Sequence, residues 1–373
     1  MNIMNVQKKE ECMKKQIALA MAGVLSVCLC ACGSSGSGKT AGSSAAASQA
    51  AETSAAAESK KSGTGTGTGE PITINISHSY TEMDQVSVEL NTAKKNIEER
   101  TNGAVTVNLY PNNTFGNLVD GVEAVMSNSP LMLMASYSQW EDIYYDASAL
   151  QCGFVFNDGQ EFLDVMESDL FKKLVSDMDE KNIHALNAAF VGGMRHVIGK
   201  KPYRNPEEIK GLKIRVPNST TYLECFKAMG ASPMGMAASE QMSALSSGVI
   251  DALDQSISLM YSTKSYEMVN QVTLLSQQPL ADALFCSTTW WNSIPEEYRE
   301  IIEDELHQAG LRYNKYSAEN EGKMREEMEK AGVIFNDGDR QAFIDNGCGD
   351  LVLKYGIGQE LLDTLADIRA KKK

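Results

Sequence analysis

The sequence predicts an α/β fold built as two lobes, and three observations support this class. Short strands with alternating apolar residues are present, most clearly at Ile72 to Ser77 and Leu212 to Val216. Helices with one apolar stripe follow such strands, as Val86 to Ile97 follows the first. About 300 residues remain after the N-terminal 70, which is enough to bury two hydrophobic cores.

The same patterns predict the remaining elements in chain order. Strands are expected at residues 105–110, 131–136, 249–253 and 274–287. Helices are expected at residues 119–127, 160–181, 206–210, 221–230 and 295–331. Strands and helices thus alternate along most of the chain, as an α/β sheet requires.

The N-terminal residues 1–32 are predicted to be a signal peptide that ends in a lipidation site. Lys14 and Lys15 precede an apolar run from Ile17 to Cys30, which is too short for a good membrane-spanning helix. Cys32 then has the position of an acylated lipoprotein cysteine. The alternative is a simple secretory signal cleaved nearby, and the start could be either Met1 or Met13.

Residues 33–70 have the composition of a flexible linker. Ser, Ala, Gly and Thr dominate, and large apolar residues are nearly absent, so this segment cannot bury enough surface to fold. Its place directly after Cys32 favours the lipid anchor. We therefore expect an extracytoplasmic protein, anchored to the outer face of the cell membrane and periplasmic if the envelope has such a space.

Charge and cysteine usage exclude several classes of protein. The net charge is −15, and the first 32 residues contribute four Lys against two Glu, so the remainder carries −17. An acidic body argues against nucleic acid as a partner and requires a local basic site for any anionic ligand. Four cysteines lie outside the leader without metal-ligand spacing, namely Cys152, Cys225, Cys286 and Cys348. We expect buried thiols, no metal site and no cofactor.

The stretch from Gly193 to Gln255 carries the strongest functional signal. In Leu212 to Val216 apolar residues alternate with cationic ones, and a proline then stops the strand, which leaves Arg215 at its carboxyl end. Ligands bind at that end of strands in open α/β sheets, and a guanidinium matches a carboxylate bidentately. Arg195 follows two glycines, which let backbone approach a ligand closely. The alternative is that both arginines simply face solvent, as most do.

This stretch resembles the solute-binding subunit of tripartite ATP-independent periplasmic (TRAP) transporters, the DctP family. Three segments carry the resemblance in the family's order and spacing: Gly193-Met194-Arg195, GLKIRVP at 211–217 and GASPMGMAASE at 230–240. The similarity extends over residues 72 to about 368, and the combination of the three segments is specific where any one alone would be weak.

The resemblance implies a two-lobed fold like that of periplasmic binding proteins, with a hinge of crossing strands and one long helix spanning both lobes. Lobe I would comprise residues 71–192 and 281–320, and lobe II residues 193–280 and 321–373. The nearly uninterrupted helical pattern from Pro295 to about Ala331 would supply the spanning helix.

The resemblance also implies a function, namely capture of a small organic acid in a cleft between the lobes. The acid would be a C4-dicarboxylate or a sugar acid such as a uronate, delivered to the small and large membrane subunits of a TRAP permease. Arg215 would clamp the carboxylate and Arg195 would be a second contact. We expect a monomer that is not an enzyme.

Four further residues are candidates for ligand contact. His78 lies in a loop that lines the cleft in the family, although it could equally be an ordinary surface-loop histidine. Ser136 lies at the end of a buried strand, from where it could reach a ligand. Gln255 stands where the sialic-acid-binding branch has an Asn that bonds its substrate. Ala238 stands where several relatives have an aromatic residue, which would widen the pocket and suggests a ligand larger than succinate.

Other functions remain open at the level of the sequence. A binding lipoprotein of this kind could instead serve an ABC importer or a sensor kinase. An extracytoplasmic hydrolase of acidic glycans is a third class, but the sequence has no nucleophile elbow and no HExxH motif.

Overall fold

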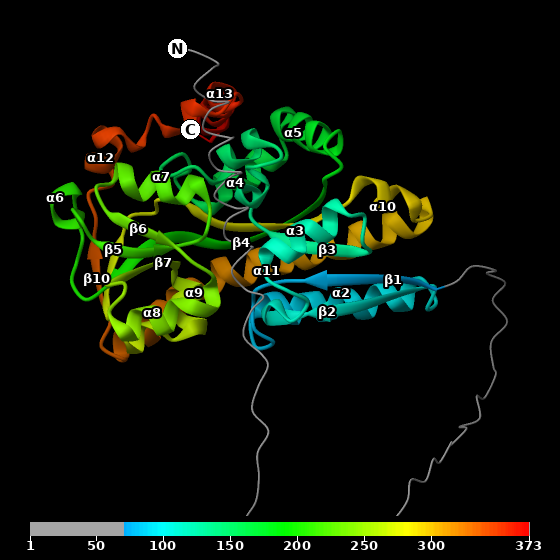
Figure 1. Ribbon diagram of the computed structural model, residues 1–373, viewed down its shortest axis with the longest axis horizontal. Helices are drawn as coiled ribbons and strands as arrows, with labels where there is room; N and C mark the ends of the chain where they lie inside the picture. Colours follow the sequence, from blue (N-terminus) through cyan, green and yellow to red (C-terminus); the bar gives the residue numbers. More distant parts are fainter. Residues whose placement is uncertain (1–70, 373) are drawn as a thin grey trace, which may run out of the picture. The chain divides into compact units, whose positions relative to one another are not determined.

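The computed structural model describes residues 71–372 of the chain, and Figure 1 shows a mixed sheet with helices on both faces. The predicted signal peptide, the acylation site at Cys32 and the linker lie outside the described residues. Within the described part, no helix is long and apolar enough to span a bilayer. The α/β class predicted from the sequence is confirmed.

A sheet of ten strands organises the described residues. Its main order is β2-β1-β3-β9-β4-β7-β5-β6, and β8 connects β4 to β10. The strands are β1 (Ile72–Ser77), β2 (Val105–Tyr110), β3 (Leu131–Ala135), β4 (His184–Gly199), β5 (Lys213–Val216), β6 (Ser232–Gly235), β7 (Ala252–Ser256), β8 (Gln271–Leu274), β9 (Pro279–Cys286) and β10 (Ile334–Asp337). β1, β2 and β3 pair in parallel, whereas β9 joins them antiparallel.

Strand β4 crosses from one part of the sheet to the other. It is 16 residues long and almost entirely buried. Its first part pairs antiparallel with β9, as at Ala189 and Ala283, and its last residues pair with β7 and β8. The strand predicted at 274–287 is shorter in the structure, where β9 covers 279–286 and β8 already ends at Leu274; Ser276 takes a left-handed conformation between the two. The resemblance implied a hinge of crossing strands, and β4 is a strand that passes between the two parts of the sheet.

The helices cover both faces of the sheet (Figure 1). They are α2 (Gln85–Arg100), α3 (Leu118–Met126), α4 (Gly159–Met166), α5 (Asp169–Asp179), α6 (Pro206–Ile209), α7 (Thr220–Ala228), α8 (Gln241–Ser247), α9 (Ile257–Thr263), α10 (Thr288–Ser293), α11 (Glu296–Lys330), α12 (Arg340–Phe343) and α13 (Gly358–Lys371). One core lies between β1 to β3 and helices α2 and α11, and another lies between β3, β4 and β9 and helices α3 to α5. Two further cores surround β5 and β7.

The C-terminal helix α13 packs against α4 and α5. Leu361 and Leu365 of α13 are fully buried in the same core as Phe162 of α4 and Leu174 of α5. Arg369 extends this contact, because its guanidinium donates to both oxygens of Glu161 in α4 at 2.8 and 2.7 Å. The end of the chain thus lies on helices that the sequence assigned to lobe I, while the lobe boundaries themselves stay a prediction.

The predicted helix at 160–181 is broken into α4 and α5. The break falls at Ser168, whose hydroxyl accepts the backbone N–H of Phe171 at 3.3 Å and so starts a second helix. Serine favours such a cap over the helix interior because its oxygen competes for nearby backbone groups. The break was not predicted, because the apolar stripe in the sequence continues through both helices.

Helix α7 is capped from a distant part of the chain. Thr221 and Glu224 have the spacing of a capping box, but none forms, because Ser219 is the N-cap and its side chain makes no cap bond. The carboxylate of Glu141, which follows β3, accepts the N–H of Thr220 at 2.7 Å instead.

Helix α11 runs 35 residues and lies along β4, as the long spanning pattern predicted. Gly310 allows the closest approach, because a Cβ there would lie 2.6 Å from the carbonyl oxygen of Ala189. Gly322, just over three turns further on, has nothing within 4 Å of the same position. The two glycines of this helix therefore have different roles.

Replacing these glycines should have opposite effects on stability. Gly310→Ala should destabilise the protein by about 1–3 kcal/mol, because the added methyl group meets backbone that cannot easily move. Gly322→Ala should stabilise it by about 0.5–1 kcal/mol, because alanine loses less backbone entropy in a helix. Urea unfolding of residues 71–373 measures both. Equal effects at the two positions would show that α11 does not press on β4 at Gly310.

Candidate functional site

Arg215 is a buried cation near the carboxyl end of β5. Only 6% of it is exposed, and its Nε and Nη2 donate to the carbonyl oxygen of Met236 at 3.1 and 2.8 Å. It forms no ion pair with any residue that the structure describes. Burial and the nearby Arg195 lower the pKa of Arg215 to about 10. A carbonyl dipole does not neutralise a full charge, so the site favours an anion.

Arg195, in contrast, has its own counterion. Its Nε donates to Oδ2 of Asp254 at 2.7 Å, and its Nη2 donates to the backbone oxygen of the same residue at 2.6 Å. Asp254 is fully buried, and its other carboxylate oxygen accepts from Nε2 of Gln277 at 2.8 Å. Burial opposes the charge of Arg195, but Asp254 outweighs it and raises the pKa of the guanidinium.

Sequence reasoning missed the role of Asp254. Strand β7 begins at Ala252, three residues later than expected, so Asp254 and Gln255 lie within the strand rather than beyond its end. An aspartate inside a fully buried strand requires a buried partner, but the sequence ALDQS gave no clear sign that this strand is buried. β7 pairs antiparallel with β4, opposing Arg195 to Ser256, which places the carboxylate of Asp254 beside the guanidinium.

A second group of polar side chains lies at the ends of β1 and β9. His78 directly follows β1, is 1% exposed, and has no hydrogen-bond partner at either ring nitrogen among the described residues. Burial lowers its pKa to about 4, so the ring is neutral at pH 7. The ring of Tyr80 is 6.4 Å away, and its hydroxyl donates to Oδ2 of Asp282 in β9 at 2.7 Å. Burial raises the pKa of Asp282.

Ser136 lies next to this group. It is the first residue after β3, and its hydroxyl is 2.8 Å from that of Ser138. The preceding residue, Ala135, pairs with Ala283 of β9, the neighbour of Asp282. The carboxyl ends of β1 and β3 and the middle of β9 thus bring His78, Ser136 and Asp282 to one region, as the parallel pairing requires.

The two other predicted residues are placed differently. Gln255 is buried, its Nε2 lies 3.3 Å from Oε1 of Gln241 and its Oε1 accepts from the hydroxyl of Ser265 at 2.6 Å. A ligand would have to displace one of these partners to bond this amide. Ala238 is exposed in a short 3₁₀ turn after β6. Ligand contact by either residue stays a prediction.

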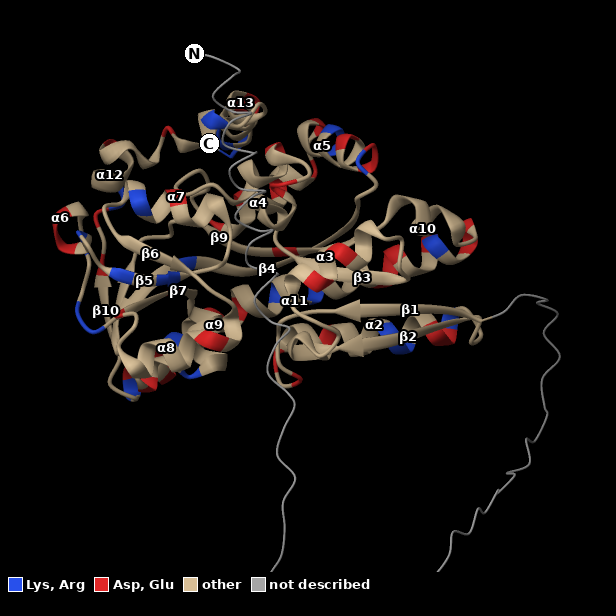
Figure 2. Ribbon diagram, viewed as in Figure 1, with Lys and Arg blue, Asp and Glu red and all other residues tan. Residues whose placement is uncertain are grey.

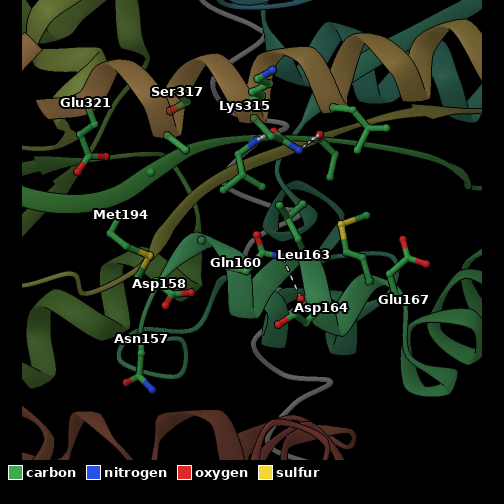
Figure 3. Close-up of a pocket in the computed structure, with 18 of the residues that line it drawn as sticks. Asn157, Asp158, Gln160, Leu163, Asp164, Glu167, Met194, Lys315, Ser317 and Glu321 are labelled. Carbon is green, nitrogen blue, oxygen red and sulfur yellow. Dashed lines mark hydrogen bonds between the residues drawn. The ribbon is translucent and has the colours of Figure 1, made fainter. Parts of the chain in front are cut away.

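A groove of about 740 Å³ lies elsewhere, between α4 and α11 along β4 (Figure 3). None of the six predicted site residues lines it. At its base the side chain of Asn314 accepts the N–H of Val191 at 2.7 Å and donates to the oxygen of Ala189 at 3.1 Å. The amide of Asn314 therefore bonds the backbone groups of β4 on the edge where no neighbouring strand lies among the described residues.

Acidic and basic residues are mixed over the outer helices (Figure 2). Figure 2 shows basic residues on β5 within the sheet and acidic residues on outlying elements such as α6. Among residues 71–372, no group of three or more His, Cys, Asp or Glu could hold a metal ion. Cys152, Cys225, Cys286 and Cys348 are free and buried, which confirms the expectation of buried thiols.

A mixed α/β sheet shared by two lobes, with an unneutralised arginine at a strand end, is typical of a protein that binds small anions. The family model of bacterial extracellular solute-binding proteins, family 7 (DctP), matches residues 76–347. The chain belongs to this family, as its three sequence segments predicted.

Known relatives agree in fold. The 2,3-diketo-L-gulonate-binding periplasmic protein YiaO of Escherichia coli K12 is 26% identical over 279 residues, which cover 73% of this chain and 85% of YiaO. A TRAP periplasmic solute-binding protein from Fusobacterium nucleatum, solved with sn-glycerol-3-phosphate, is 28% identical with a TM-score of 0.76, covering 80% of this chain and 99% of its own. One from Ochrobactrum anthropi with L-fuconate is 26% identical with a TM-score of 0.74, covering 79% and 99%.

Removing one member of the Arg195–Asp254 pair should be costly for stability. Asp254→Leu or Arg195→Met alone leaves a buried charge or polar group without its partner and should destabilise the protein by about 3–5 kcal/mol. The double variant should lose clearly less than the sum of the two, because no charge remains buried. A double-mutant cycle by urea unfolding measures this coupling. Additive losses would mean that the pair is not energetically linked.

Proposed function

We propose that this protein binds a small organic acid in a cleft between its two lobes and holds the ligand's carboxylate at Arg215. The observation that carries this proposal is the buried guanidinium of Arg215, which has a backbone carbonyl but no carboxylate partner among the described residues. A planar guanidinium in a water-poor site offers both charge and a bidentate geometry to a carboxylate.

The mechanism follows from the cost of an unpaired charge. When the lobes close around Arg215 without an anion, the guanidinium loses water and gains nothing, which disfavours the closed state. A bound carboxylate removes this penalty, and its charge-assisted bonds strengthen as water leaves. The closed population then reports the presence of ligand.

The relatives support an acidic ligand and a transport role. YiaO is named for 2,3-diketo-L-gulonate, and the two solved structures hold sn-glycerol-3-phosphate and L-fuconate, all of them organic anions. A C4-dicarboxylate or a sugar acid such as a uronate fits this range. We propose delivery to the small and large membrane subunits of a TRAP transporter, with an ABC importer or a sensor kinase as alternative partners. No observation in the described residues favours a hydrolase.

Arg215→Ala should weaken binding of the organic acid by about 2–5 kcal/mol, because the clamp and its charge are removed. Isothermal titration calorimetry measures the change in Kd. Arg204→Ala is a matched control, because Arg204 lies on the surface of the same part of the chain, where it pairs with Glu208. A loss of less than about tenfold would exclude Arg215 as the main contact.

Attachment to the membrane is a separate proposal that depends on Cys32, which lies outside the described residues. The position of Cys32 after an apolar leader and before a polar linker supports acylation there. Cys32→Ala should abolish labelling by a palmitate analogue and move the protein into the soluble fraction. A Cys32→Ala protein that stays labelled and membrane-bound would contradict this proposal.

A further inference from the structure

The site has two buried arginines but only one uncompensated positive charge. Arg195 is held by Asp254 at 2.7 Å, and Asp254 is further fixed by Gln277 at 2.8 Å. Because Asp254 is fully buried and the pair is closed by a second bond to its backbone oxygen, a ligand would have to compete with an existing ion pair. Arg215 alone is left to neutralise a ligand charge.

The remaining polar groups suit hydroxyls rather than a second acid. The neutral ring of His78 offers one donor and one acceptor nitrogen, and neither makes a hydrogen bond of good geometry among the described residues, although the backbone of Tyr80 lies near enough to oppose the lowering of the ring's pKa. One ligand hydroxyl can accept a hydrogen bond from the protonated nitrogen, and a second ligand hydroxyl can donate to the other nitrogen. Leaving both nitrogens unpaired in a closed site would be costly.

Asp282 adds a repulsive element to the same region. One of its oxygens already accepts from the hydroxyl of Tyr80 at 2.7 Å, which leaves the other as an acceptor for a ligand hydroxyl. If Asp282 is ionised it repels a second carboxylate, and if it is protonated it still provides no countercharge. Within the described residues of this group, a second ligand carboxylate therefore meets no free cation.

We infer that the ligand is a polyhydroxy monocarboxylate of the aldonate or uronate type, and that Asp282 and the Arg195–Asp254 pair discriminate against dicarboxylates. This inference rests on the proposed function, because it takes Arg215 as the clamp for the single carboxylate. Arg215 binds the carboxylate, while His78 and Asp282 bond the hydroxyl groups.

Six matched six-carbon acids, compared with a hexuronate, succinate and sn-glycerol-3-phosphate, test this inference on the unaltered protein by calorimetry. Hexonates such as gluconate and galactonate should bind most tightly. Their aldarates, glucarate and galactarate, carry a second carboxylate in place of the terminal hydroxymethyl group and should bind at least roughly tenfold more weakly. Hexanoate has no hydroxyl groups, and adipate has two carboxylates and no hydroxyl groups. Both should bind at least roughly tenfold more weakly than the hexonates. The doubly charged sn-glycerol-3-phosphate and succinate should be weaker than the best hexonate or hexuronate.

The outcomes separate this inference from the proposed function. Binding of succinate, adipate or an aldarate as tightly as any hexonate or hexuronate would overturn the inference and leave the organic-acid function intact. Failure of every acid in the set to bind, with a neutral sugar binding instead, would overturn the function itself. These comparisons need no variant, so they hold even if a substituted protein does not fold.

Two variants assign the discrimination to residues. Asp282→Asn keeps the shape and an acceptor but removes the charge, so the ratio of hexonate to aldarate affinity should fall by roughly tenfold. His78→Phe removes both ring nitrogens at similar volume, so hexonate affinity should fall while hexanoate affinity stays unchanged. Thermal unfolding without ligand confirms that each variant is folded. An unchanged affinity ratio in Asp282→Asn would exclude Asp282 as the discriminating residue.

Discussion

The rest of the fold depends on the backbone hydrogen bonds that strand β4 makes to its neighbouring strands. Its 16 residues pair with β9 at one end and with β7 and β8 at the other, so both parts of the sheet share one backbone. α11 lies along the same strand, at a distance set by the missing side chain of Gly310. Arg195 lies where the pairing of β4 changes from β9 to β7, and its ion pair to Asp254 fastens that point.

Local elements could be predicted from the sequence because their signals are local. The alternation at 72–77 and 105–110 gave β1 and β2 to the residue, and the helical pattern after Pro295 gave α11. Where a prediction was wrong, a distant residue or a short polar side chain decided the structure. Glu141 caps α7 from 79 positions away in the chain, and Ser168 divides a continuous apolar stripe into two helices.

The candidate site shows the same division. The resemblance to a known family named Arg195 and Arg215, and both are buried on neighbouring parts of the sheet around β7. Which of the two has a counterion depends on Asp254, through a pairing between β4 and β7 that no sequence spacing displays. His78 was a candidate from its position after β1, but its lack of partners becomes visible only when the surrounding side chains are placed.

The amide of Asn314 bears on the edge of β4 that has no neighbouring strand among the described residues. The outer edge of β4 beside β9 has no neighbouring strand among the described residues, and such edges are templates for pairing with another chain. By accepting from Val191 and donating to Ala189, Asn314 occupies the bonds that an incoming strand would need. One side chain of α11 thereby takes the bonds that a neighbouring strand would make at these two residues, which disfavours pairing of this edge with another chain.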